Sequence, residues 1–333
     1  MPVVTKVSVD DWPRGRRSQL QVQIVGNGLG QIIHIPVVIV RGAKKGPVLG
    51  LTAAVHGNEL NGMHIIHRIV GTVDPKKLAG TIVAVPVVNV PGYLSNERRF
   101  NDGRDLNRMM PGSPAGRPSS VYAYRFINRI VESFEYLVDL HTASEGRANS
   151  FYVRADMSDK DASWMAYAQR PQIILHNKGE DGTLRNAAMN LGIPSITVEV
   201  GNPQRYQKKM VDMGTQGVIN VMAKLGMIHH DLTDHRRKPI VCLRSFWMYT
   251  AAGGVLQVLP ELTDRVEKGE LVARVLDIYG NTVEEYHTED AGIVIGKSVN
   301  PVNQTGSRIL HLGIVAGTKE IRESILTHES PHE

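Results

Sequence analysis

The chain is poor in the residues that build cross-linked or membrane-bound structures. Among its 333 residues there is one cysteine, Cys242, so neither an intrachain disulfide nor a cysteine-based zinc site can form. No apolar run reaches the roughly 18 residues that a membrane-spanning helix needs. The first residues also lack the apolar core of a signal peptide. We therefore expect a cytoplasmic protein with no membrane partner.

Aromatic residues are scarce as well, at 5% of the chain, and they are not interleaved with the basic residues. Lys and Arg number 38 against 33 Asp and Glu, but basic pairs such as Arg16 with Arg17 and Lys208 with Lys209 are scattered along the chain. A protein that binds nucleic acid gathers such residues on one face. The composition therefore predicts no nucleic-acid partner, and the positive excess suits small anionic ligands.

What the chain does contain, from residue 47 onward, is an alternation of apolar strands and helical stretches. A β-hairpin is expected before it, at residues 20–40. Strands are expected at residues 48–55, 81–88, 136–141, 172–175 and 193–200, and helices at residues 59–70, 120–134 and 207–225. This alternation predicts an α/β fold with a mixed, mostly parallel sheet flanked by helices.

After residue 239 the pattern changes to short strands and turns, which predicts a small C-terminal all-β domain. Its phrases at residues 253–255 and 266–271 resemble the biotinyl/lipoyl-like barrel sandwich. The modifiable lysine of that family is missing, because Tyr279, Gly280 and Asn281 occupy the expected hairpin tip. We expect an α/β domain at residues 1–228, a polar linker at 229–239 and a β-rich cap domain at 240–333.

A histidine, His56, follows the first buried strand, and a glutamate, Glu59, stands three residues after it. With a helix opening at about this point, both side chains face one place at the carboxyl edge of the sheet. His141 ends another apolar strand in the same way. Two histidines and one glutamate are a known ligand set of catalytic zinc, so the pattern predicts one Zn²⁺ per chain. For His56 and Glu59 alone, an ordinary polar group at a strand end is the alternative.

The long irregular segment at residues 89–119 carries further polar groups, and segments of that length usually serve function. Asn107 and Arg108 form a rigid donor fork that suits a carboxylate of the substrate. Asp105 is placed to accept the imidazole N–H of His56 and so to fix its tautomer. Surface ion pairs within the loop are the alternative.

Glu199 lies inside an apolar strand, where a charge without a partner would be costly. Beside a zinc site, a buried carboxylate at a strand end is suited to take a proton from water and to return it to a leaving amine. We therefore expect Glu199 to be the general base and acid. A buried structural ion pair is the alternative.

These motifs in this order resemble the succinylglutamate desuccinylase/aspartoacylase family, a branch of the zinc carboxypeptidase fold. The resemblance covers residues 45–225 by motif and extends to the C-terminal β domain by layout. It implies that His56, Glu59 and His141 bind zinc, that Glu199 is the base, that Asn107 and Arg108 hold the α-carboxylate of the substrate, and that Arg99 polarises the scissile carbonyl. Arg98 and Arg104 are alternatives for the last role.

By this resemblance, residues 1–228 form the catalytic domain of a zinc-dependent amide hydrolase. Its substrate is expected to be a small N-acylated amino acid; the acyl group stays open, and a related group deacetylates N-acetylated diaminobutyrate. A metallocarboxypeptidase acting on peptides is one alternative, against which the cap domain counts because it restricts the size of the substrate. A non-catalytic protein that binds zinc or carboxylates is another. The chain is expected to work alone or as a homo-oligomer.

Overall fold

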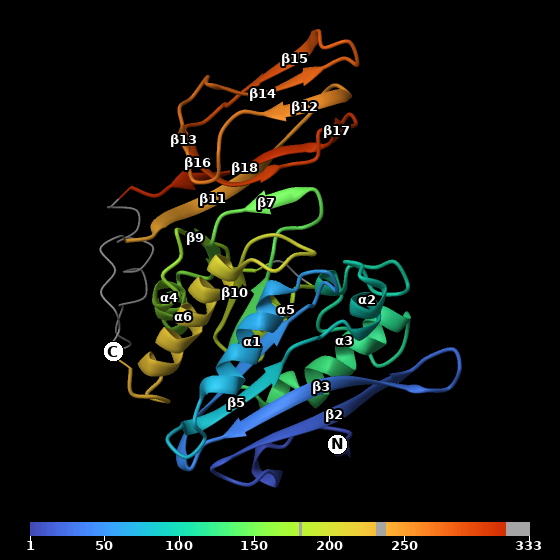
Figure 1. Ribbon diagram of the computed structural model, residues 1–333, viewed down its shortest axis with the longest axis vertical. Coiled ribbons are helices and arrows are strands. Elements are labelled where there is room, and N and C mark those ends of the chain that lie inside the picture. Colours follow the sequence, from blue (N-terminus) through green and yellow to red (C-terminus); the bar gives the residue numbers. More distant parts are fainter. Residues whose placement is uncertain (180–181, 231–237, 318–333) are drawn as a thin grey trace, which may run out of the picture.

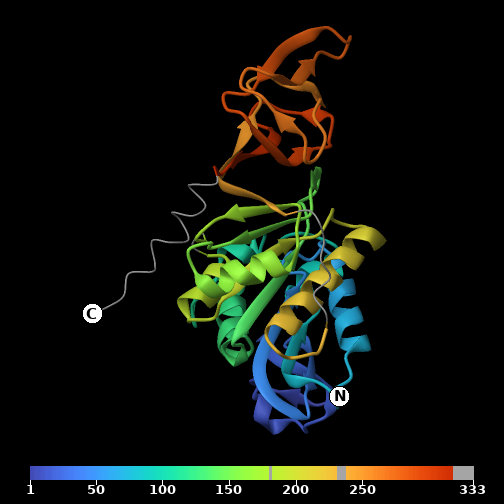
Figure 2. The same ribbon diagram turned by 90° about the vertical axis from the view of Figure 1, so that its left-hand side faces the viewer.

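One long twisted sheet runs through the computed structural model, which describes residues 1–179, 182–230 and 238–317. The N-terminal strands, in blue, lie at one end of the molecule, and the C-terminal strands, in orange and red, lie at the other (Figures 1 and 2). The strand order is β1-β2-β3-β5-β4-β6-β10-β8-β9-β11-β18-β16-β13, with β7 paired to β16. The functional residues lie near the middle of this order.

The bounds of these strands are β1 Val3–Val4, β2 Arg16–Gly26, β3 Ile32–Arg41, β4 Lys44–Ala53, β5 Ala79–Val85, β6 Tyr136–His141, β7 Arg147–Asn149, β8 Tyr152–Ala155, β9 Ile173–His176, β10 Ser195–Glu199, β11 Ile240–Tyr249, β13 Arg265–Val266, β16 Gly292–Ser298 and β18 Arg308–Val315. A second sheet, in the order β15-β14-β12-β17, contains β12 Gly254–Val258, β14 Leu271–Leu276, β15 Thr282–His287 and β17 Val302–Asn303.

Helices cover both faces of the central strands, because those strands are apolar on both sides. The helices are α1 Asn61–Thr72, α2 Val90–Ser95, α3 Pro118–Arg129, α4 Lys160–Ala168, α5 Leu184–Asn190 and α6 Lys208–Lys224, with 3-10 turns at Val9–Asp11, Leu106–Arg108 and Val131–Ser133. Apolar side chains of α1, α4 and α6 pack into one core, and those of α3 and α5 pack into a second core. This is the layered arrangement that an alternating chain predicts.

The strands that carry the site are parallel neighbours. β4 pairs with β6 and β6 pairs with β10, with His141 opposite Glu199 in register. The chain leaves β4 through Ala54, whose φ of 51° lies in the left-handed region that side chains other than glycine rarely adopt. Helix α1 then packs so closely on β6 that a Cβ atom at Gly62 would lie 2.6 Å from the Cβ of Leu140. These contacts hold residues 54–62 against the end of β6.

The predicted α/β fold class is confirmed, and several bounds differ from expectation. The segment at 89–119, expected to be irregular, contains α2 and a 3-10 turn. The helix expected at residues 120–134 is interrupted, because Ile130 leaves the helical region with φ −128° and ψ −57°. The sequence did not predict the strands β1, β7, β8, β13, β15 and β17 or the helices α2, α4 and α5.

The last strands of the long sheet, β11, β18, β16 and β13, pair antiparallel with one another. With the four-stranded second sheet they enclose a separate apolar core, which includes Leu256, Val272 and Leu310. β11 joins them to the rest of the molecule, since it pairs in parallel with β9 and antiparallel with β18. We propose that the chain divides near the start of β11, in keeping with the expected domains; residues 231–237 of the expected linker lie outside the described residues.

No helix in the described part of the chain is long and apolar enough to cross a membrane. The expected cytoplasmic location stays a prediction.

Candidate active site

Three side chains with metal-binding groups meet at the carboxyl edge of β4 and β6. His56, Glu59 and His141 each offer one ligand atom, and these atoms lie within 4.8 Å of one another. All three residues are buried. Glu59 precedes α1, which begins at Asn61, two residues later than the sequence pattern predicted. The structure therefore brings together the three residues proposed from the sequence as zinc ligands.

The contacts inside the cluster converge on the Nδ1 atoms of the two imidazoles. Nδ1 of His56 lies 2.9 Å from Oε1 of Glu59, and Nδ1 of His141 lies 3.0 Å from Oε2 of the same carboxylate. The two Nδ1 atoms lie 3.2 Å from each other. The backbone N–H of Thr142 also donates to Oε2 of Glu59, at 3.0 Å. The carboxylate is thus fixed between the two rings.

Each imidazole turns its other nitrogen toward a second carboxylate. Nε2 of His56 lies 2.9 Å from Oδ1 of Asp105, as the sequence pattern predicted, and Nε2 of His141 lies 2.7 Å from Oδ2 of Asp139. Thr52 Oγ1 donates to the other oxygen of Asp139 at 2.7 Å. Sequence reasoning missed Asp139. Its signal was a carboxylate two residues before a histidine at a strand end, a spacing that places both side chains on one face of the strand.

This donor set fits a divalent cation. With Nε2–H donated to a carboxylate, each imidazole has its lone pair on Nδ1, and both lone pairs then point to the same place beside a third anionic donor. Nitrogen lone pairs 3.2 Å apart repel each other unless a cation or a proton lies between them. Two imidazole nitrogens and a carboxylate oxygen are donors that zinc prefers.

The charges around the cluster keep its carboxylates ionised. Burial opposes the ionisation of Glu59, but the charge of His56 and hydrogen bonds from both histidines hold its pKa below the ordinary value. Burial likewise opposes the ionisation of Asp105, while His56 and Arg98 lower its pKa. An ionised carboxylate is the form that binds a metal ion.

Glu199 ends β10 beside this cluster and is buried. Asn149 Nδ2 donates to its Oε2 at 3.2 Å, and Arg154 Nε lies 3.8 Å from its Oε1. Burial raises the pKa of Glu199, and the charge of Arg154 acts in the opposite direction. A raised pKa makes a carboxylate a stronger base, which is what a general base and acid requires.

The three arginines considered for polarising the scissile carbonyl of the substrate have different surroundings in the structure. Arg98 lines the cavity beside the cluster, and its guanidinium donates to Oε1 of Glu59 at 2.6 Å and to Oδ2 of Asp105 at 2.9 Å. Arg99 is exposed and donates instead to the carbonyl of Gly103 at 3.1 Å. Arg104 is exposed as well. Neither Arg99 nor Arg104 lines the cavity, so Arg98 replaces Arg99 as our candidate for that role.

The two residues predicted to bind a carboxylate of the substrate lie at the same cavity. Asn107 and Arg108 both line it. Asn107 Oδ1 accepts the backbone N–H of Leu184 at 2.8 Å, and Arg108 Nη1 donates to the carbonyl of Asn107 at 2.9 Å. The amide of Asn107 is thus oriented by the start of α5, which leaves its Nδ2 group as the donor for a ligand.

The cavity has a volume of about 380 Å³ and is strongly cationic. Its lining includes six arginines: Arg98, Arg108, Arg147, Arg154, Arg185 and Arg308. Among the described residues that line it, Glu199 is the one carboxylate. The residues Trp247, Arg308 and His311 come from the C-terminal strands, and sequence reasoning missed them because nothing in a short β pattern indicates which side chains face a distant site.

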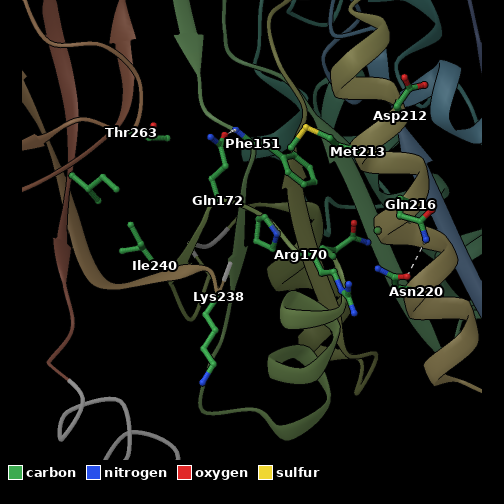
Figure 3. Close-up of a pocket in the computed structure, with 14 residues that line it drawn as sticks. Phe151, Arg170, Gln172, Asp212, Met213, Gln216, Asn220, Lys238, Ile240 and Thr263 are labelled. Carbon is green, nitrogen blue, oxygen red and sulfur yellow. Dashed lines mark hydrogen bonds between the residues drawn. The ribbon is translucent and has the colours of Figure 1, made fainter. Parts of the chain in front are cut away.

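A larger cavity of about 660 Å³ lies elsewhere, between α6 and the strands β9 and β11 (Figure 3). Phe151, Met213 and Ile240 give it an apolar lining, and Asp212 at its edge is paired with Arg68 and Lys208. None of its described lining residues is a histidine. His141 and Glu199 line the smaller, cationic cavity instead.

Comparison with known proteins supports an amide hydrolase of the deacylase class. The chain belongs to the succinylglutamate desuccinylase/aspartoacylase family, since the model of that catalytic domain matches residues 45–225. It is 23% identical over 283 residues to the N-alpha-acetyl-L-2,4-diaminobutyric acid deacetylase of Halomonas elongata, an alignment that covers 80% of this chain and 81% of the relative.

Solved structures show the same fold. The product-bound ectoine utilization protein EutE (DoeB) of Ruegeria pomeroyi superposes with a TM-score of 0.82 at 20% identity, covering 91% of this chain and 96% of that one. A succinylglutamate desuccinylase/aspartoacylase of Rhodobacter sphaeroides gives 0.84 at 21% identity, covering 94% and 98%. The likeness therefore extends through the C-terminal strands.

Proposed function

We propose that the protein is a zinc-dependent deacylase that hydrolyses the amide bond of an N-acylated amino acid or a related small molecule. The observation that carries this proposal is the meeting of His56, Glu59 and His141 beside a buried Glu199. When bound by the three ligands, zinc would supply Lewis acidity, which polarises a carbonyl group and makes a water molecule more acidic.

The roles of the protein's own groups follow from their positions. Glu199 takes the proton of the attacking water and returns it to the leaving amine, with its carboxylate held by Asn149 and Arg154. Arg98 lies where a guanidinium can stabilise the negative charge that develops on the carbonyl oxygen. Asn107 and Arg108 hold the α-carboxylate of the substrate.

The carboxylates behind the histidines act through them. Asp105 and Asp139 accept the Nε2–H groups and so hold both imidazoles in the tautomer that offers Nδ1 to the ion. They are positioning residues.

The shape of the cavity favours a small substrate over a peptide. Phe246, Trp247 and His311 from β11 and β18 line the cavity together with Glu199. A volume of about 380 Å³ suits one small molecule and leaves little room for a polypeptide. A metallocarboxypeptidase is therefore the weaker proposal. A protein that binds zinc without catalysing a reaction is weaker as well, because it leaves the buried Glu199 without a function.

The experiment that tests the function measures metal and activity together. Purified protein is analysed for bound metal and assayed with N-acetyl and N-succinyl derivatives of aspartate, glutamate and 2,4-diaminobutyrate, and with short peptides. We expect one zinc per chain and hydrolysis of at least one N-acyl amino acid, lost on chelation and restored by zinc. Hydrolysis of peptides alone would establish the carboxypeptidase, and bound zinc without any hydrolysis would refute the enzyme.

A further inference from the structure

Two arginines in the cavity pack on one tryptophan. The guanidinium carbon of Arg147, on β7, lies 5.3 Å from the ring centroid of Trp247, and that of Arg308, at the start of β18, lies 5.0 Å from it. The imidazole of His311 stacks on the same indole, with centroids 4.9 Å apart and an angle of 8° between the planes. The aromatic surface holds the flat guanidinium groups in place.

These two arginines have no counterion in the described part of the chain. Arg98, by contrast, is bonded to Glu59 and Asp105. Glu145 lines an adjoining hollow with Arg147 and Arg308, but it forms no ion pair with either. Burial and the charges of Arg308 and Arg98 lower the pKa of Arg147 to about 10. Two like charges held together in a half-buried place are costly, and a bound anion would offset that cost.

The pair lies within reach of a substrate at the reacting centre. Arg147 and Asn149 stand two residues apart on β7, so their side chains leave the strand on the same side, roughly 6–7 Å apart. Asn149 is the residue that donates to Glu199. Arg98, which contacts Glu59, also contributes to the positive potential at Arg147. One small molecule can therefore span from the cluster to this pair.

We infer that Arg147, Arg308 and Trp247 form a subsite for a second carboxylate of the substrate, remote from its α-carboxylate. The inference rests on the proposed function and names the substrate class: an N-acyl amino acid with at least two negative charges. A substrate with a free ammonium group, such as the one in the name of the Halomonas relative, meets guanidinium groups at this place and is disfavoured. The second carboxylate belongs either to the acyl group or to the side chain of the amino acid.

Matched pairs of substrates separate these two sources. N-acetylaspartate is compared with N-acetylasparagine for the side chain, and N-succinylalanine is compared with its terminal amide for the acyl group. A charge-assisted hydrogen bond contributes roughly 1.5–3 kcal/mol, or about 10–100-fold. We expect kcat/KM to favour the acid over the amide by that factor in one of the two pairs, and that pair identifies the source.

The variants connect this preference to the subsite. Arg147→Gln, Arg308→Gln and the double variant are expected to lose most of the preference, because kcat/KM falls much more for the acid substrates than for the matched amides. If the double variant does not fold, the two single variants still test the subsite. Arg244→Gln is the matched control, because Arg244 is exposed on β11, pairs with Asp290 at 3.4 Å and does not line the cavity. Its preference should equal that of the wild type.

Binding of succinate, with succinamide as the neutral comparison, gives a readout that does not need turnover. By calorimetry the wild type should bind succinate at least about 10-fold more tightly than the double variant does. Equal succinate affinity in wild type and double variant, or equal kcat/KM for acid and amide in both pairs, would overturn the subsite. Absence of any hydrolysis would refute the proposed function alone, and the succinate comparison would then decide the subsite.

Discussion

His56 and His141 face each other through their Nδ1 atoms, 3.2 Å apart, while the Nε2 atom of each ring lies against its own carboxylate. The hydrogen bonds of the Nε2 atoms thus determine whether the two Nδ1 atoms have lone pairs available for a metal ion. A proton held on Nε2 leaves the Nδ1 lone pair free for an ion, and two such lone pairs beside Glu59 make a three-donor site. Four predictions test this arrangement and its surroundings.

Asp139→Asn should weaken zinc binding. The neutral amide accepts the Nε2–H of His141 less strongly than the carboxylate does, so the imidazole is a poorer and less firmly oriented ligand. Loss of such a partner usually costs about 10–100-fold in metal affinity. Competition with a chromophoric chelator measures the Kd. Asp156→Asn is the control, since Asp156 lies 3.9 Å from His176, outside the cluster. A wild-type Kd in Asp139→Asn would remove Asp139 from the site.

Glu199→Gln should abolish most turnover without loss of metal. The amide keeps the shape of the side chain and its place beside Asn149, but it cannot take a proton from water. We expect kcat to fall by about 10²–10⁴-fold, the usual contribution of a general base. The zinc content should stay at the wild-type level. A fully active Glu199→Gln enzyme would contradict the assignment of the base.

Arg98→Gln and Arg99→Gln form a matched pair, because the residues are neighbours with different surroundings. Arg98 contacts Glu59 and Asp105, whereas Arg99 is exposed and contacts a backbone carbonyl. Replacement of Arg98 should lower kcat/KM by about 10²–10³-fold, as for other groups that stabilise an oxyanion. Replacement of Arg99 should change it less than about threefold. A larger loss from Arg99→Gln would return the role to Arg99.

His311 should make the fold less stable in mild acid. Burial lowers its pKa well below the ordinary value of 6.5, and the charges of Arg154 and Arg308 act in the same direction. Below pH 6.5 the unfolded chain therefore binds a proton that the folded protein does not. The free energy of unfolding then falls as the pH falls, by up to about 1.4 kcal/mol per pH unit from this group.

Urea denaturation of metal-free protein measures this effect, since metal binding itself depends on pH. Between about pH 6.5 and pH 5.5 the free energy of unfolding should change less steeply with pH in His311→Gln than in the wild type. The difference in slope should be up to about 1.4 kcal/mol per pH unit, the value for one proton. Identical slopes in the two proteins would show that this imidazole is not the source.

The sequence allowed the prediction of the central fold because its strands are long apolar runs bounded by clear signals. β6 was predicted with its observed bounds, since Tyr136–His141 is apolar except for Asp139 and ends at a polar residue. β15 was missed because Thr282–His287 is exposed on both faces, which removes the alternation that marks a strand. β8 has four residues and α5 has seven, too few for a period to show.

The residues of the candidate site likewise include some that the sequence predicts and some that it does not. His56, Glu59, His141 and Glu199 are predictable because the carboxyl ends of parallel strands meet at one edge of a sheet. The choice of Arg98 over Arg99 depends on the direction of two adjacent side chains in a loop, which no sequence period determines. Arg147, Trp247 and Arg308 meet through the pairing of β7 with β16 and of β11 with β18, contacts between distant segments.

The strand pairings that hold the C-terminal strands also limit which molecules can enter the cavity. β11 pairs with β9 at residues 240–242 and with β18 from Cys242 onward, with a register shift between Cys242 and Arg244. A second link is the pairing of β7 with β16. A swing of those strands would have to break backbone hydrogen bonds, each of which contributes about 1 kcal/mol. The side chains that β11 and β18 contribute to the cavity wall therefore stay in place, and a molecule too large for the cavity is excluded whatever functional groups it carries.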